Sequence, residues 1–153
     1  MKGKEMHKKL IPLLSFIFLL GIASCETEDS ILSVDNDNII DITIENKNSP
    51  RIVKENGSFS FGLKGNDFNG TTNEAVHFSS EDIVIAINLE NHRQGSCDIQ
   101  IKSDYNEVLF SKTITSNIIY SEVIKLDDYP EQVILEFEDF TGTLKMAIAE
   151  DDD

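Results

Sequence analysis

The chain has 153 residues, and its 28 acidic residues outnumber its 13 lysines and arginines, which gives a formal net charge of −15. Such a charge repels nucleic-acid phosphates and anionic lipid headgroups, and residues 26–153 contain no cluster of Lys and Arg, so nucleic acid is excluded as a partner. The length is that of a single domain, large enough to bury a sizeable core without disulfide bonds.

Residues 1–24 have the pattern of a bacterial export signal. Lysines are concentrated among the first nine residues, an apolar run follows from Leu10, and small residues precede Cys25. The apolar run is shorter than the roughly 20 apolar residues that a membrane-spanning helix requires. We therefore expect a signal peptide over residues 1–24 rather than a transmembrane helix.

The four residues Ile22-Ala23-Ser24-Cys25 resemble the lipobox, the processing site of bacterial lipoproteins. This resemblance covers residues 1–25 and implies that the Cys25 thiol is acylated and that the chain is cut just before it. Each buried CH₂ group contributes about 0.8 kcal/mol, so two or three acyl chains would hold the protein at a membrane. There are two alternatives. Residues 1–24 could be an ordinary secretory signal, with Cys25 unrelated to processing, or they could be a membrane-spanning anchor.

Residues 25–38 are expected to be the lipidated cysteine and an extended, acidic linker. Within the linker, Glu26-Thr27-Glu28-Asp29 resembles the acidic signal for surface transfer of Bacteroidota lipoproteins, and Asp29-Ser30-Ile31 resembles the O-glycosylation site of that phylum. These resemblances imply a lipid-anchored protein of the bacterial cell envelope, at the outer membrane and exposed on the cell surface.

Residues 39–149 are expected to form a β domain, followed by an acidic tail at 150–153. Apolar and polar residues alternate with a period of two, most clearly in Ile39–Glu45 and Ile83–Leu89, and no segment has a helical period. Turn-rich polar breaks separate the expected strands at residues 46–50, 64–73, 91–95, 103–106, 127–130 and 140–142.

About eight short strands at this spacing predict an all-β fold, a single antiparallel β-sandwich of immunoglobulin-like or jelly-roll-like type. The segment 97–148, through its strand alternation and the turn at Gly142, resembles the hairpin pattern of small secreted β-sandwich proteins of Bacteroides, whose function is unknown. This resemblance implies a fold but no activity.

Metal binding has one candidate segment. Asp35, Asp37 and Asp41 have a spacing similar to that of the oxygen ligands in a calcium loop, but the sixth position of that template is Ile40 rather than glycine. A hydrated linker is the preferred interpretation of this segment. We expect neither a metal nor a cofactor.

Catalysis has little support in the sequence. Outside the leader there are two histidines, His77 and His92, and Cys97 falls on the strand face that is expected to be buried, which suits a small core residue better than a nucleophile. Glu136 and Glu138 are neighbours on one strand face, but an acidic chain contains such pairs by chance. We therefore expect that the protein is not an enzyme.

Exposed aromatic side chains are the candidates for ligand contact. Tyr105 lies in an expected hairpin turn, Tyr129 precedes a proline, and Phe68 lies in the polar segment 64–73. The sequence thus predicts a membrane-anchored protein with a non-enzymatic binding domain, whose loops 64–73 and 103–106 contact a protein or glycan partner at the envelope. The alternatives are a carbohydrate-binding accessory protein at the cell surface and, third, an enzyme with a carboxylate-lined cleft.

Overall fold

The computed structural model describes residues 42–151. The predicted signal peptide, the lipidation site Cys25, the linker with Asp35, Asp37 and Asp41, and the last two residues lie outside this range. The secondary-structure elements within residues 42–151 are all β-strands, so the all-β prediction is confirmed. No helix in this part of the chain is able to cross a bilayer.

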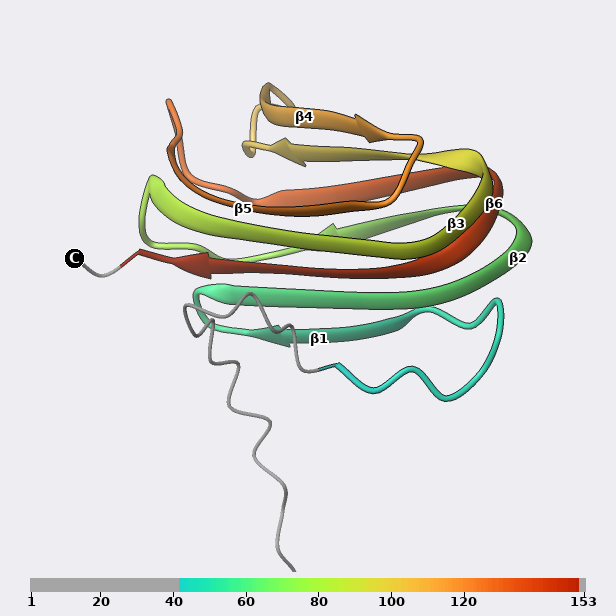
Figure 1. Ribbon diagram of the computed structural model, residues 1–153. Coiled ribbons are helices and arrows are strands. Elements are labelled where there is room, and N and C mark those ends of the chain that lie inside the picture. The colour runs from blue at the N-terminus through green and yellow to red at the C-terminus, as the bar shows by residue number, and fades with distance from the viewer. Residues whose placement is uncertain (1–41, 152–153) are drawn as a thin grey trace, which may run out of the picture. The chain divides into compact units, whose positions relative to one another are not determined.

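Six antiparallel strands form one open sheet (Figure 1). The order across the sheet is β1-β2-β6-β3-β4, and β5 also pairs with β3. The strand β3 is long enough to pair with β5 along its first part and with β4 along its last part, on the edge away from β6. The strands are β1 (Arg51–Glu55), β2 (Ser58–Ala75), β3 (Asp82–Lys102), β4 (Val108–Ile114), β5 (Ile118–Lys125) and β6 (Gln132–Glu150).

The predicted number of about eight strands is wrong for the described part of the chain, which has six. Three expected breaks are bends inside long strands: residues 64–73 belong to β2, 91–95 to β3 and 140–142 to β6. The prediction of a free loop at 64–73 is therefore wrong as well. The polar, turn-forming residues in these stretches suggested loops. In the structure, each strand pairs with its neighbour before the bend and pairs with it again after the bend.

The bends are made by β-bulges. Asp67 in β2, Asn91 and Gly95 in β3 and Asp139 in β6 all have positive φ, and the strand register shifts at the same places. A bulge bends its strand, and Asp, Asn and Gly adopt the left-handed conformation at the least cost. Asn69 and Asp139 join two of these bends, because each donates a hydrogen bond of 2.9 Å to the other's side-chain oxygen.

Inward-facing side chains from both sides of the bends form one core. The rings of Phe61 and Phe137 stack with centroids 5.7 Å apart, although in the sheet Phe61 is paired with Met146 and Phe137 with Gly70. The edge of the Phe140 ring completes the cluster, 5.2 Å from Phe137. In Figure 1 the long strands curve and return, which brings these distant positions together.

Residues 42–50 lie beside the sheet without forming a strand, so the predicted strand 39–45 is wrong for its described part. The edge of β2 at residues 58–62 is already occupied by β1, which leaves no backbone partner there for this segment. Ile42 is nevertheless buried, and it covers Gly62 together with Ile44. The alternating pattern therefore predicted correctly that Ile42 is buried, while the secondary structure is different.

Candidate functional site

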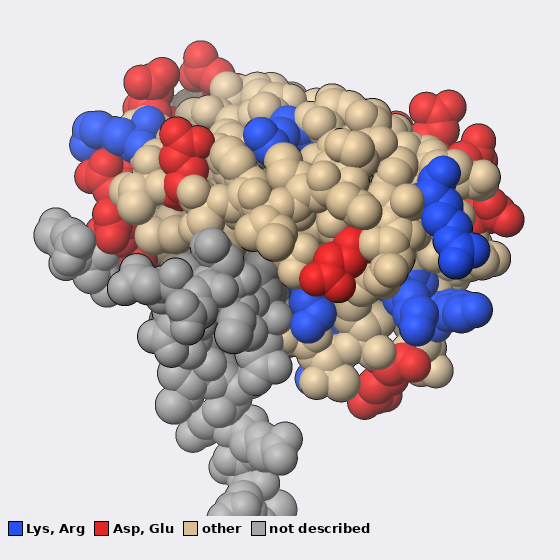
Figure 2. Space-filling model, viewed as in Figure 1, with Lys and Arg blue, Asp and Glu red and all other residues tan. Residues whose placement is uncertain are grey.

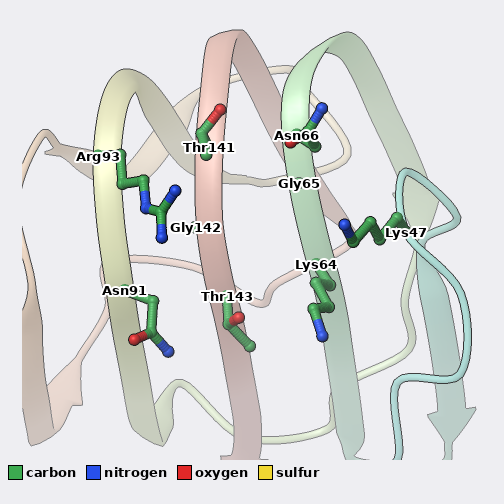
Figure 3. Close-up of a pocket in the computed structure, with 9 residues that line it drawn as sticks. All are labelled: Lys47, Lys64, Gly65, Asn66, Asn91, Arg93, Thr141, Gly142 and Thr143. Carbon is green, nitrogen blue, oxygen red and sulfur yellow. The ribbon is translucent and has the colours of Figure 1, made fainter.

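The bends of β2, β6 and β3 lie side by side and enclose a shallow pocket of about 340 Å³ (Figure 3). Three cationic side chains come from three different segments, and four amide or hydroxyl side chains lie between them. We call this site the basic pocket, and its lining residues are Lys47, Lys64, Gly65, Asn66, Asn91, Arg93, Thr141, Gly142 and Thr143.

The floor of the basic pocket is bare backbone at a pair of glycines. Gly65 and Gly142 face each other in the register of β2 and β6. A Cβ atom on Gly65 would lie 2.4 Å from the ring of Phe140, and one on Gly142 would lie 3.1 Å from the Leu89 side chain. The close packing of Phe140 beneath the bend therefore requires glycine at position 65, and a side chain at either glycine would point toward the core rather than into the pocket.

Asn48 brings Lys47 next to Lys64. The backbone N–H of Asn48 donates to the Lys64 carbonyl at 2.9 Å, and the Asn48 side chain exchanges hydrogen bonds of 2.9 and 2.7 Å with the backbone of Asn66. These bonds connect the segment before β1 to β2 and form the isolated bridge between Lys47 and Lys64. Two positive charges are thereby held on neighbouring backbone positions.

The third cation comes from the bulge in β3. Next to Arg93, the His92 backbone N–H donates to the Asn117 side chain at 2.8 Å, and the His92 ring lies 3.1 Å from the Gly95 carbonyl oxygen. These contacts hold the bulge from both sides. In Figure 3 the Arg93 guanidinium extends toward Gly142, and the Lys47 side chain extends toward β2.

The charges of the basic pocket are not neutralised within the described chain. Lys47, Lys64 and Arg93 form none of the ion pairs found among residues 42–151, and no carboxylate lines the pocket. The nearby carboxylates of Asp67 and Glu90 are hydrogen-bonded to Gln94 and Asn88, respectively. Figure 2 shows Lys and Arg side chains at the end of the molecule where the long strands bend, with Asp and Glu side chains along the rim of the same end.

The structure places two of the predicted contact residues at one end of the sheet and the third elsewhere. Tyr105, in the β3–β4 turn, is 82% exposed, and Tyr129, in the β5–β6 connection, is 45% exposed. Their loops are adjacent, because the N–H of Glu131 donates to the Lys102 carbonyl at 2.9 Å. Phe68 lies at the bend, half-buried, with its ring 5.5 Å from Phe137.

Among the residues considered for catalysis, the structure buries the cysteine. Cys97 is fully buried, as predicted. Its burial is the larger cause, and the negative charge of Asp98 the smaller one, that raises the pKa of the thiol far above the ordinary value. A thiol in this environment stays protonated and is a poor nucleophile. Within residues 42–151 no three His, Cys, Asp or Glu side chains are arranged to hold a metal. The calcium candidates Asp35, Asp37 and Asp41 remain outside this range.

The basic pocket is the functional candidate that the sequence did not indicate. Lys47, Lys64 and Arg93 occur in three separate polar stretches, none of which is rich in basic residues. A pattern could have suggested them only if the pairing of Gly65 with Gly142 had been known, since this pairing brings the stretches together.

Comparison with known proteins does not identify a family. No protein-family model matches this chain, and no curated protein matches it significantly. The assignment of a function therefore depends on the residues themselves and on their geometry.

Proposed function

We propose that this chain is a lipid-anchored, non-enzymatic binding protein of the bacterial cell envelope. Cys25 is its anchor, the acidic residues 26–38 are its spacer, and the β domain presents a binding site at the outer membrane, exposed on the cell surface. The observation that carries the binding role is the basic pocket, in which three cations without an ion-pair partner among residues 42–151 line one site on a strongly acidic protein.

The charge distribution supports binding as the role of this pocket. Residues 25–153 hold 9 basic and 27 acidic residues, yet three of the basic ones line a pocket to which the described part of the chain contributes no carboxylate. Like charges held close together are destabilising unless a counter-charge joins them. A bound partner with negative charge would supply that counter-charge, and the surrounding Asn and Thr side chains would orient it.

We also propose that the sheet acts as a sandwich-type domain, with the parts on either side of the bends as its two layers. The contact between Phe61 and Phe137 supports this arrangement, because it joins side chains from the two parts. In this proposal, one bent sheet supplies both layers of the expected immunoglobulin-like or jelly-roll-like sandwich, which is ordinarily built from two separate sheets. Nuclear Overhauser effects between the two rings would test it, and their absence would contradict it.

Carbohydrate recognition is a second candidate, and the exposure of Tyr105 and Tyr129 in adjacent loops favours it. Exposed aromatic side chains offer flat apolar surfaces to sugar rings. Binding on a glycan array that is lost in both Tyr105→Ala and Tyr129→Ala would support this role. Binding that is unchanged in both variants would remove the tyrosines from it.

The anchor is tested by fractionation of cells that produce the full chain. We expect the wild type in the membrane fraction with an acylated Cys25 as its first residue, and we expect Cys25→Ala to be released or left unprocessed. Cys97→Ala is the matched control, because it also removes one thiol but leaves the lipobox intact. Mass spectrometry of the N-terminal peptide that shows a bare Cys25 or another cleavage site would contradict the proposal.

The binding role is tested by affinity capture from the same membranes. We expect wild-type protein to retain a specific partner that the double variant Lys64→Gln/Arg93→Gln loses. Arg51→Gln is the control, because Arg51 is exposed and lies outside the basic pocket. Identical captured material from the wild type and the double variant would contradict a binding role for the pocket.

A further inference from the structure

We propose that the basic pocket binds a short acidic saccharide through the carboxylate of one of its sugar units. This inference rests on the proposed binding function and specifies the ligand class for the same site.

The cations select a negatively charged group. Arg93 offers a planar guanidinium that pairs with a carboxylate through two parallel hydrogen bonds, and Lys47 and Lys64 add two compact positive charges. The bridge between the backbones of Lys47 and Lys64 places both side chains at the same pocket without any ligand. The two ammonium groups extend in different directions in Figure 3, so an anion gathers them when it binds.

The neutral lining favours a ligand that also carries hydroxyl groups. Lysine and arginine side chains only donate hydrogen bonds, whereas the Asn and Thr side chains here both donate and accept. The Thr141 hydroxyl oxygen already accepts a bond of 3.0 Å from the Asp67 backbone, so its proton remains available to a ligand. A fully deprotonated anion such as sulfate has no proton to donate to the side-chain oxygens of Asn66 and Asn91, whereas a sugar hydroxyl has one.

Size and overall charge limit the ligand to a short one. A volume of about 340 Å³ is near the lower end of the range of roughly 300–1,000 Å³ for small-molecule pockets, which suits one or two sugar units. A long polyanion would extend beyond the pocket onto a protein with a net charge of −15 and would be repelled. None of the described residues that line the pocket is aromatic, so they offer no platform on which a nucleobase could stack.

The experiment measures binding by calorimetry to the full chain, extracted from membranes in a mild nonionic detergent. The probe is digalacturonate, and its dimethyl ester is the matched neutral probe that retains all of the hydroxyl groups. We expect digalacturonate to bind, the ester to bind at least about tenfold more weakly, and added salt to weaken only the charged probe. We expect Arg93→Gln and Lys64→Gln each to weaken digalacturonate binding by about tenfold.

Arg51→Gln is the control variant, because it removes one exposed positive charge outside the pocket and should change the affinity by less than about twofold. Absence of digalacturonate binding, equal affinity for the ester, or equal losses in Arg51→Gln and Arg93→Gln would overturn the inference. Sodium sulfate that binds as tightly as digalacturonate would overturn the saccharide part. If the wild type still captures a protein partner through Arg93, the inference fails while the proposed function stands.

Discussion

The bend of β3 provides a sharp test of the fold, because Gly95 lies there with φ of +80° against the backbone of β6. In Gly95→Ala the added Cβ would be 2.2 Å from the carbonyl oxygen of Glu138 and 2.4 Å from that of Asp139, where side-chain Cβ atoms do not come within 3.0 Å. Both opposing atoms belong to the backbone of a paired strand. The overlap is therefore relieved only if β3 and β6 separate at the bend.

Two costs add in Gly95→Ala. A left-handed conformation costs a non-glycine residue about 1–2 kcal/mol, and overpacking in a close-packed interior costs about 1–3 kcal/mol. The expected loss in the free energy of unfolding is their sum, about 2–5 kcal/mol, out of the roughly 5–15 kcal/mol typical of a native domain. With a urea m-value of about 2 kcal/mol/M, the midpoint of unfolding falls by about 1–2.5 M.

Gly57→Ala is the matched control. Gly57 also has positive φ, +70°, but its added Cβ would meet the carboxyl end of the Glu150 side chain, which is able to turn away. Turning away breaks the hydrogen bonds that Ser79 donates to the Glu150 carboxylate, so we expect the conformational cost of about 1–2 kcal/mol and up to about 1 kcal/mol for these exposed bonds, without the overpacking against backbone. Far-ultraviolet circular dichroism in urea measures both variants, because the chain contains no tryptophan for fluorescence. Equal losses in the two variants would refute the steric argument for the bend.

Three further predictions concern single side chains. Phe137→Ala should lower the free energy of unfolding by about 3–5 kcal/mol in the same urea assay, because Phe137 is 3% exposed among three other phenylalanine rings, and a loss below about 1 kcal/mol would contradict its central place. Ser60→Ala should be neutral or slightly stabilising, because the Ser60 hydroxyl is buried without a hydrogen-bond partner among residues 42–151, and a loss above about 1 kcal/mol would reveal a partner. The pKa of Tyr120 is raised to about 12 by burial and then by the Glu122 carboxylate, which accepts a hydrogen bond from the Tyr120 hydroxyl. The contribution of the protonated hydroxyl to stability is therefore present below pH 10 and is lost as the pH rises through 12. Phenolate absorbance should show a late-titrating tyrosine that Tyr120→Phe removes, and an unchanged titration curve would exclude this assignment.

The sequence by itself determined the fold class and much of the core. Alternating apolar residues in Ile83–Leu89 predicted a buried strand face, and Ile83, Ile85, Ile87 and Leu89 are all buried. The same pattern predicted that Cys97 is a core residue, and it is fully buried. A period of two is a local property of an extended chain with one face in the core, so a single sequence is enough to recognise it.

Only the tertiary structure decided that the polar stretches are bends rather than loops. Asp67, Asn91, Gly95 and Asp139 have the residue types of turns, and their positive φ values fit a loop as well as a bulge. Whether the chain leaves the sheet at such a residue depends on a partner strand that continues alongside it. That partner is up to several tens of residues away, as in the pairing of Gly65 with Gly142.

The basic pocket depends on the tertiary structure for the same reason. Lys47, Lys64 and Arg93 are isolated positive charges in an acidic sequence, and each by itself is typical of a solvated surface. They meet because three bulged strands bend at the same level and because Asn48 joins a further segment to β2. The alternation of apolar and polar side chains is a local property of the sequence, whereas a site lined by several strands depends on the register between those strands.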